Sequence, residues 1–199
     1  MAMSNNFKFI LPRIFFLLGG LLLLFLFMVP LWRISLIAPQ YPDGVHMWIY
    51  INKIGGSEPG TLQNINILNH YIGMKYIEPD SIPELVYFPY AVIAFVVLAI
   101  ISAIVDKKWM YISWFSVFIL CCCLAMYDFY LWEYDYGHNL DPNAIMKFEG
   151  ESFQPPLFGN KVLLNFMAKS YPHIGGYVIM VSILLTASAT FLKHKFSKV

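Results

Sequence analysis

Long apolar runs alternate along the chain with two polar segments. Four runs are long enough for a helix that crosses a bilayer, which takes about 20 residues. They cover residues 14–32, 85–105, 109–132 and 174–192. Their apolar residues are not confined to one helical face, as they would be in a surface helix of a soluble protein. The pattern therefore predicts an all-α integral membrane protein with four transmembrane helices.

The first run shares with signal peptides the basic residues that precede it, Lys8 and Arg13. Its apolar stretch is longer than that of a typical signal peptide, and the following RISLIAPQYP has no cleavage site of small residues. We therefore interpret this run as an uncleaved membrane anchor.

The basic residues nearest the helix ends indicate the orientation, because cytoplasmic loops are enriched in Lys and Arg. Seven of them gather on one side of the four predicted helices: Lys8, Arg13, Lys107, Lys108, Lys193, Lys195 and Lys198. Residues 1–13, 106–108 and 193–199, and hence both termini, are therefore predicted to be cytoplasmic. Segments 33–84 and 133–173 are predicted to be extracytoplasmic. In a bacterium, the protein would be a multi-pass protein of the inner (cytoplasmic) membrane.

The first extracytoplasmic segment contains two recognisable patterns. Residues 45–54 alternate as in a strand, whereas TLQNINILNHYIGM carries apolar residues at helical spacing. The second stretch predicts a short helix that begins with Thr61 as its N-cap. Residues 81–84, SIPE, match a capping box at the start of the second transmembrane helix.

The second extracytoplasmic segment predicts two helical pieces. Asp141 followed by Pro142 is typical of a helix start, and residues 161–170 are interpreted as a short helix. Both extracytoplasmic segments contain apolar residues at a density that solvated loops do not tolerate. We therefore expect the two segments to pack together as a structured cap on the membrane.

Histidine and methionine supply the candidate chemistry of these segments. His70 and Met74 lie four residues apart on the predicted helix 61–74, and therefore on one face. Imidazole and thioether groups suit copper, which makes this pair a possible copper site. Lower-ranked candidate ligands are His46, His138 and His173. An isolated histidine is equally compatible with an ordinary hydrogen-bonding role, and methionine often fills gaps in a core.

The outer end of the third transmembrane run carries Tyr127, Asp128 and Tyr130. An acidic residue at membrane depth is a candidate functional group, so these three residues could contact a partner or a quinol. The alternative is that Asp128 lies at the boundary and is wetted. The sequence contains no catalytic motif, which favours a non-catalytic subunit over an enzyme, and its net charge of +1 gives no reason to expect nucleic-acid binding.

Two stretches, TLQNINILNHYIGMKYIEP and ESFQPPLFGNKVLLNFMAKSYP, carry a family resemblance. The chain resembles the NosB-like polytopic membrane proteins that accompany clade II nitrous oxide reductase. The resemblance implies an accessory or anchoring subunit that serves a periplasmic copper enzyme, in maturation or in membrane attachment. It implies no ligand set. The alternative is a structural or quinol-site-contributing subunit of a respiratory complex, with no metal of its own.

Overall fold

The computed structural model describes residues 5–146 and 152–197. The elements are, in chain order, α1 (Asn5–Leu22), the 3-10 helix η1 (Leu23–Phe27), β1 (Trp32–Ala38), β2 (Tyr41–Ile49), β3 (Ile54–Gly56), α2 (Thr61–Ile72), the 3-10 helix η2 (Pro79–Ser81), α3 (Glu84–Val105), α4 (Lys108–His138), β4 (Gly159–Leu163), β5 (Phe166–Pro172) and α5 (Ile174–Phe196).

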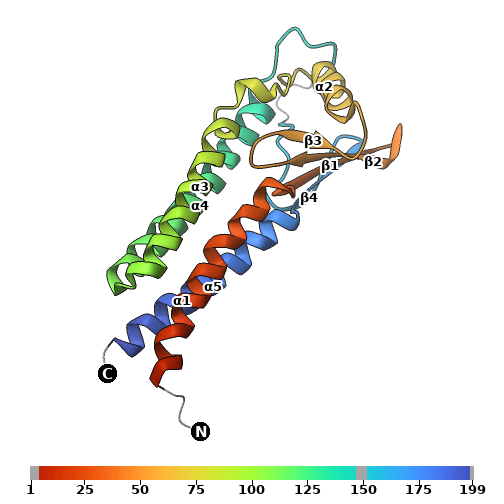
Figure 1. Cartoon of the computed structure of the whole chain (residues 1–199). Coiled ribbons are helices and arrows are strands. Elements are labelled where there is room, and N and C mark those ends of the chain that lie inside the picture. The colour runs from red at the N-terminus through yellow and green to blue at the C-terminus, as the bar shows by residue number, and fades with distance from the viewer. Residues whose placement is uncertain (1–4, 147–151, 198–199) are drawn as a thin grey trace.

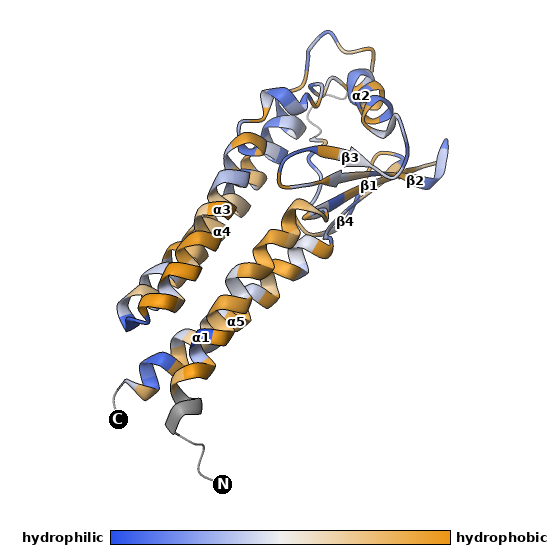
Figure 2. Cartoon of the chain, in the orientation of Figure 1, coloured by the Kyte–Doolittle hydropathy of each residue, from blue (hydrophilic) through white to orange (hydrophobic). Residues whose placement is uncertain are grey.

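Four helices within the described residues are long and apolar enough to cross a membrane: Phe9–Phe27, α3, α4 and α5. They lie side by side, and both ends of the chain lie at the same end of the bundle (Figure 1). Their surface is apolar along most of its length (Figure 2). The four predicted membrane helices are thus confirmed as helices of suitable length and composition.

Two helix boundaries differ from the sequence prediction. The first helix ends at Phe27 because Pro30 follows, whose nitrogen cannot donate a helical hydrogen bond, and Trp32 already belongs to β1. In contrast, α4 continues to His138, well past the predicted end at residue 132. This extra length carries α4 up to the level of the strands.

The all-α prediction is wrong because the chain also forms a five-stranded antiparallel sheet, with strand order β3-β2-β1-β5-β4. The helix predicted over residues 161–170 is instead the β4–β5 hairpin. In β5, Ala168 and Ser170 are fully buried while Lys169 and Tyr171 are partly exposed, which is the two-residue period of a strand. β5 forms its ladder of backbone hydrogen bonds with β1, which lies more than 100 residues earlier in the sequence.

Pairing of β1 with β5 joins the two predicted extracytoplasmic segments, which confirms that they pack together. The expected short helix is α2, and it ends at Gly73 in the left-handed conformation. The N-cap of α2 is Gly60, however, since Thr61 uses its hydroxyl on the backbone of Glu58.

The other two predicted helix starts are also wrong. Ser81 donates its hydroxyl hydrogen bond to the carbonyl of Glu78, so SIPE does not form a capping box. Asp141 accepts a hydrogen bond from the backbone N–H of Asn143 within a turn, and residues 141–146 are not helical.

One face of the sheet packs on α2 and on the end of α4. Its cluster of buried apolar side chains includes Ile34, Met47, Ile65 and Tyr136. This face, α2 and the end of α4 together form what we call the sheet domain. Figure 1 shows α2 on one side of the sheet, whereas α1 and α5 reach the sheet from the other side.

Candidate functional site

The end of α2 and the loop of residues 139–146 form the tip of the sheet domain. The backbone N–H of Asp141 donates to the carbonyl of Gly73 over 2.8 Å, and that of Met146 donates to the carbonyl of Tyr71 over 3.0 Å. Left-handed Gly73 leaves space for this loop, because a Cβ there would lie 2.9 Å from the Cβ of Ala144. The loop is therefore fixed against α2.

His70 and Met74 meet at a pocket of about 450 Å³ in this tip. The His70 side chain is exposed, and its ring stacks on that of Tyr76 with 5.8 Å between the centroids. Met74 is half-buried and also packs against the core of the sheet domain. Other residues that line the pocket are Lys75, Asn139, Asp141 and Asn143. The predicted pair thus lines one pocket together with nitrogen and oxygen groups, although Met74 also points into the interior of the sheet domain.

The described residues contain no cluster of three or more His, Cys, Asp or Glu side chains able to hold a metal ion. A copper ion at the tip would therefore depend on His70 and Met74 with amide, backbone or single carboxylate oxygens. Asn66 lies one turn before His70 on α2 and is not available as a ligand. Its side-chain amide accepts from the backbone N–H of Ile77 and donates to the carbonyl of Ile77.

Large apolar side chains surround this pocket on the outside. Their exposed fractions are 54% for Ile67, 42% for Tyr71, 51% for Tyr76, 65% for Ile145 and 43% for Met146. We call these five residues, with His70, the tip surface. Exposed aromatic and aliphatic side chains gathered on ordered backbone are typical of a protein-binding surface.

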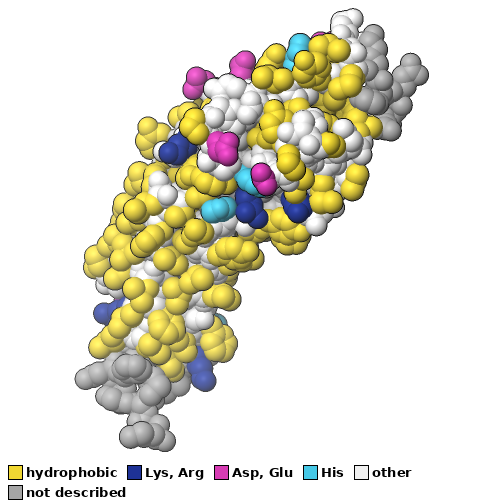
Figure 3. Space-filling model, turned by 90° about the vertical axis from the view of Figure 1, so that its right-hand side faces the viewer, with side chains coloured by type: hydrophobic (Ala, Val, Ile, Leu, Met, Phe, Trp, Pro, Cys, Tyr) yellow, Lys and Arg dark blue, Asp and Glu magenta, His cyan; other side chains and the backbone are white. Residues whose placement is uncertain are grey.

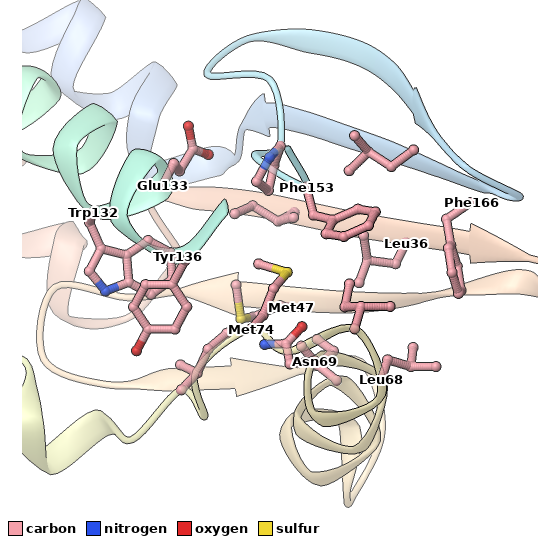
Figure 4. Close-up of a pocket in the computed structure, with 16 residues that line it drawn as sticks. Leu36, Met47, Leu68, Asn69, Met74, Trp132, Glu133, Tyr136, Phe153 and Phe166 are labelled. Atoms are coloured by element: carbon pink, nitrogen blue, oxygen red, sulfur yellow. The ribbon is translucent and has the colours of Figure 1, made fainter. Parts of the chain in front are cut away.

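A second cavity, of about 70 Å³, lies inside the sheet domain. Figure 4 shows Met47 and Met74 pointing into it from β2 and from the segment after α2, with Phe153 opposite. Trp132, Glu133 and Tyr136 of α4 line one end. The volume is that of about two water molecules, and the lining is almost entirely apolar.

Glu133 carries the one carboxyl among the described residues of that lining, which also includes the side-chain amide of Asn69. Its side chain is fully buried, and neither carboxylate oxygen has a hydrogen-bond partner among the described residues. About 20 residues of α4 suffice to cross the apolar core of a membrane, so a helix entering at Trp109 has left it near Asp128. Glu133 lies beyond that point, level with the sheet. Burial there raises its pKa from 4.5 to about 8.

Sequence reasoning did not single out Glu133, although a signal existed. Phe129, Glu133, Tyr136 and Gly137 follow helical spacing and share one face of α4. That face would have been recognised as buried only if the strands beneath it had been predicted.

None of the lower-ranked histidines lines the tip pocket, although His138 directly precedes the tip loop. His46 is on β2, with its Nδ1 2.8 Å from the hydroxyl of Ser35. His173 precedes α5, and its Nδ1 is buried without a hydrogen-bond partner among the described residues. Burial first, and then the charge of Arg33, lower the pKa of His173. His138 ends α4 and stacks on Tyr134.

Tyr127, Asp128 and Tyr130 are exposed on the outer side of α4. None of them lines either of the two cavities. The structure places them where lipid or another protein would meet the helix, so their contact with a partner or quinol stays a prediction.

Comparison of the chain with family models, curated proteins and solved structures finds no match.

Proposed function

We propose that the protein is a membrane-anchored accessory subunit whose sheet domain, outside the cytoplasm, docks a partner protein through the tip surface. The observation that carries the proposal is the exposed apolar tip surface. It lies beyond the outer end of α4, at the end of the molecule opposite the two termini (Figure 1). An ordered apolar surface held away from lipid is suited to binding a soluble partner.

The orientation in this proposal rests on the positive-inside distribution of Lys and Arg. Reporter fusions at Gly56 and at Lys107 test it, since the first lies in β3 and the second in the turn between α3 and α4. We expect an extracytoplasmic signal at Gly56 and a cytoplasmic signal at Lys107. The opposite pattern would place the tip surface in the cytoplasm and exclude a periplasmic partner.

The partner we propose is a periplasmic copper enzyme, and the resemblance to NosB-like proteins makes nitrous oxide reductase the first one to test. Full-length protein carrying a photo-crosslinking residue in place of Tyr71 is mixed with the purified enzyme. A matched control carries the crosslinker in place of Trp109, which is at least as exposed as Tyr71 but lies at the opposite end of the bundle. We expect an enzyme adduct at position 71 only.

Two charge insertions, Ile67→Asp and Ile145→Asp, provide a second measure of docking. Both side chains are more than half exposed, so the changes leave the core intact while placing charge on the apolar surface. We expect the affinity for nitrous oxide reductase to fall at least tenfold in each variant. Unchanged affinity, or equal crosslinking at positions 71 and 109, would exclude this enzyme as the tip's partner.

Copper binding at the tip forms a separable part of the proposal, supported by His70 and Met74 lining the same pocket. Copper content of the purified protein after loading with Cu(I) is compared between His70→Ala, Met74→Leu and the control His194→Ala, which lies on α5 at the opposite end of the bundle. Loss of copper in the first two variants alone supports contact at the tip. A wild-type protein that takes up no copper would leave docking as the only function of this surface.

A further inference from the structure

The sheet face that does not carry α2 has its own chemistry, and the strand register defines it. Paired residues of antiparallel strands share a face, so Arg33 lies beside Trp48 and Tyr171, while Ser35 lies beside His46 and Lys169. We call these six residues the basic face. It is separate from the tip surface and from the cavity that contains Glu133.

Three groups able to carry positive charge surround Ser35 on this face. His46 and Lys169 are its neighbours on the two adjacent strands, and Arg33 lies two residues away on β1. Directly paired Cα atoms are about 5 Å apart, so these side chains converge on one small area. Ser35 is only 3% exposed because its longer neighbours cover it.

The two permanent cations of the face are Arg33 and Lys169. Arg33 is exposed and Lys169 is half-buried, and no ion pair joins either to a carboxylate within residues 5–146 and 152–197. Figure 3 shows Lys or Arg side chains close to histidine side chains, just past the apolar surface of the helices, with Asp or Glu side chains beside the histidines. The face therefore carries two cations that form no direct ion pair among the described residues, next to the membrane helices.

The chain connections hold this face close to the helix ends. β1 begins five residues after η1 ends, and β5 leads directly through His173 into α5. Backbone hydrogen bonds fix this junction: His173 donates to Leu31 over 2.9 Å and Gly175 donates to Pro30 over 2.8 Å. The sheet extends sideways from these ends, with α2 on its far side (Figure 1), so the basic face looks back toward the membrane surface.

The outer part of the same face is apolar. Val162 of β4 pairs with Met167 of β5, two residues along the strand from Lys169, and these side chains are 67% and 38% exposed. Trp48 and Tyr171 flank the cations, as aromatic residues do in membrane interfaces. Cations, aromatic rings and exposed aliphatic groups on one surface match the layered chemistry of headgroups above acyl chains.

We propose that the basic face rests on the outer leaflet and binds the phosphate of an anionic phospholipid headgroup through Arg33 and Lys169, with His46, whose ring is held by the buried hydroxyl of Ser35, as a hydrogen-bonding group. Val162 and Met167 enter the boundary between headgroups and acyl chains. The proposal requires that the long helices cross a membrane, and it does not depend on any partner at the tip.

Lipid selectivity tests the site in the full-length protein in detergent. Native mass spectrometry measures the binding of phosphatidylglycerol and of phosphatidylcholine to wild type and to Arg33→Gln/Lys169→Gln. The control, Lys75→Gln/Lys161→Gln, removes the same charge from positions outside the basic face. Each cation near an anionic membrane contributes a factor of about five to the affinity. The affinity of Arg33→Gln/Lys169→Gln for phosphatidylglycerol should therefore fall about 30-fold.

The other results are equally decisive. Arg33→Lys, which keeps the charge, should retain most of the phosphatidylglycerol affinity, so a folding defect in the double variant does not obscure the result. Equal binding of the two lipids by wild type, or an equal loss in the control, would overturn the proposal. Full competition by millimolar glycerol phosphate would also overturn it, since the site would then be one for soluble phosphates.

Crosslinking to lipid tests the geometry independently of charge. A photo-crosslinking residue at Val162 should form lipid adducts in nanodiscs, whereas the same residue at Ile67 on the tip surface should not. The two positions are similarly exposed, so access of water to them does not explain a difference. Absence of lipid adducts at Val162 would show that the face does not rest on the membrane.

Discussion

Asp106 and Glu133 are two carboxylates withdrawn from water at opposite ends of α4, and their surroundings differ completely. Asp106 lies in the turn before α4, where Arg13 and Lys193 donate to it over 2.6 and 2.5 Å, and the hydroxyl of Tyr111 donates over 3.0 Å. Glu133 has no hydrogen-bond partner among the described residues. The first group is a connection between elements, and the second is a buried acid without compensation.

The pKa values of the two groups move in opposite directions for this reason. Burial alone would raise the pKa of Asp106, but the hydrogen bonds from Arg13, Lys193 and Tyr111 lower it below its ordinary value. At Glu133, burial acts alone and raises the pKa to about 8. Asp106 is therefore charged at neutral pH, whereas Glu133 holds its proton.

The contrast separates architecture from candidate chemistry. Asp106 ties together α1, α5 and the α3–α4 turn at the end of the bundle that carries the termini. A buried acid without a partner does not join elements in this way, and it lowers the stability of the fold whenever it ionises. Glu133 is thus the residue of the sheet domain whose presence packing does not explain.

The largest effect we expect is that of Asp106→Ala. Arg13 and Lys193 would then face each other without a counter-ion, and the left-handed backbone at Asp106, with φ of 57°, would carry an alanine. Removing one partner of a buried ion pair costs about 3–5 kcal/mol. Unfolding by SDS titration in mixed micelles should show a loss in this range.

Asp106→Asn separates charge from backbone strain, because asparagine tolerates the left-handed conformation. The Asp106→Asn variant should be more stable than Asp106→Ala but clearly less stable than wild type. An Asp106→Asn variant as stable as wild type would mean that the three donors do not require the negative charge, and the contrast with Glu133 would fail.

The next effect is a gain of stability in Glu133→Gln that depends on pH. The unfolded chain releases the Glu133 proton near its ordinary pKa of 4.5, whereas the folded chain holds it to about pH 8. The free energy of unfolding of wild type therefore falls as pH rises through this window. One pKa unit corresponds to about 1.4 kcal/mol, so the variant should be about 3 kcal/mol more stable than wild type at pH 7.

At pH 4.5 the two proteins should differ little, because the carboxyl is then largely protonated in the folded state and partly so in the unfolded one. Thermal unfolding in detergent at pH 4.5, 7 and 9 measures this trend. The exposed Glu58→Gln serves as the control and should not reproduce it. A stability difference between Glu133→Gln and wild type that is constant with pH would show that Glu133 is ionised or partnered in the folded protein.

Gly137 sharpens the comparison by testing what covers Glu133. It lies one turn further along α4, and its carbonyl accepts a hydrogen bond of 2.9 Å from the backbone of Phe153. A Cβ at Gly137 would clash with the backbone of Gln154. Gly137→Ala should therefore push this segment off α4, at a cost of about 1–3 kcal/mol, and admit water to the carboxyl.

Hydration of Glu133 would lower its pKa, so Gly137→Ala should flatten the fall in stability between pH 4.5 and 8. The double variant Gly137→Ala/Glu133→Gln should show no such fall. If Gly137→Ala keeps the full pH dependence of wild type, the segment after residue 152 is not what excludes water from Glu133.

The helices were predictable from sequence because an apolar run of about 20 residues is a local property. The sheet was only partly predictable from sequence. The alternation in β2 was recognised, but β5 depends on pairing with β1, and its apolar run in KVLLNF fits a helix equally well until that partner is known. Local patterns do not encode the pairing of residues 32–37 with residues 167–172.

The candidate site follows the same division. His70 and Met74 both line one pocket, but the helical face predicted for them is not what joins them, because α2 ends at Ile72 and Met74 follows the left-handed Gly73. The loop that completes the pocket comes from residues 139–145, and the burial of Glu133 comes from strands and from the segment after residue 152. These relations required the tertiary structure.

The smallest effect we expect belongs to a third carboxylate, Asp135, two residues from Glu133 but on the surface. Lys75 donates to it over 2.7 Å, and the side chains are 53% and 42% exposed. The hydrogen bonds from Lys75 and Asn139 lower the pKa of Asp135, so the pair should stabilise the fold above pH 4 and lose this effect as pH falls below it. Because water screens exposed pairs, a double-mutant cycle with Lys75→Ala and Asp135→Ala should give a coupling below about 1 kcal/mol, abolished near 1 M salt. A coupling as large as the loss in Asp106→Ala, or one insensitive to salt, would show that burial is not what distinguishes the three carboxylates.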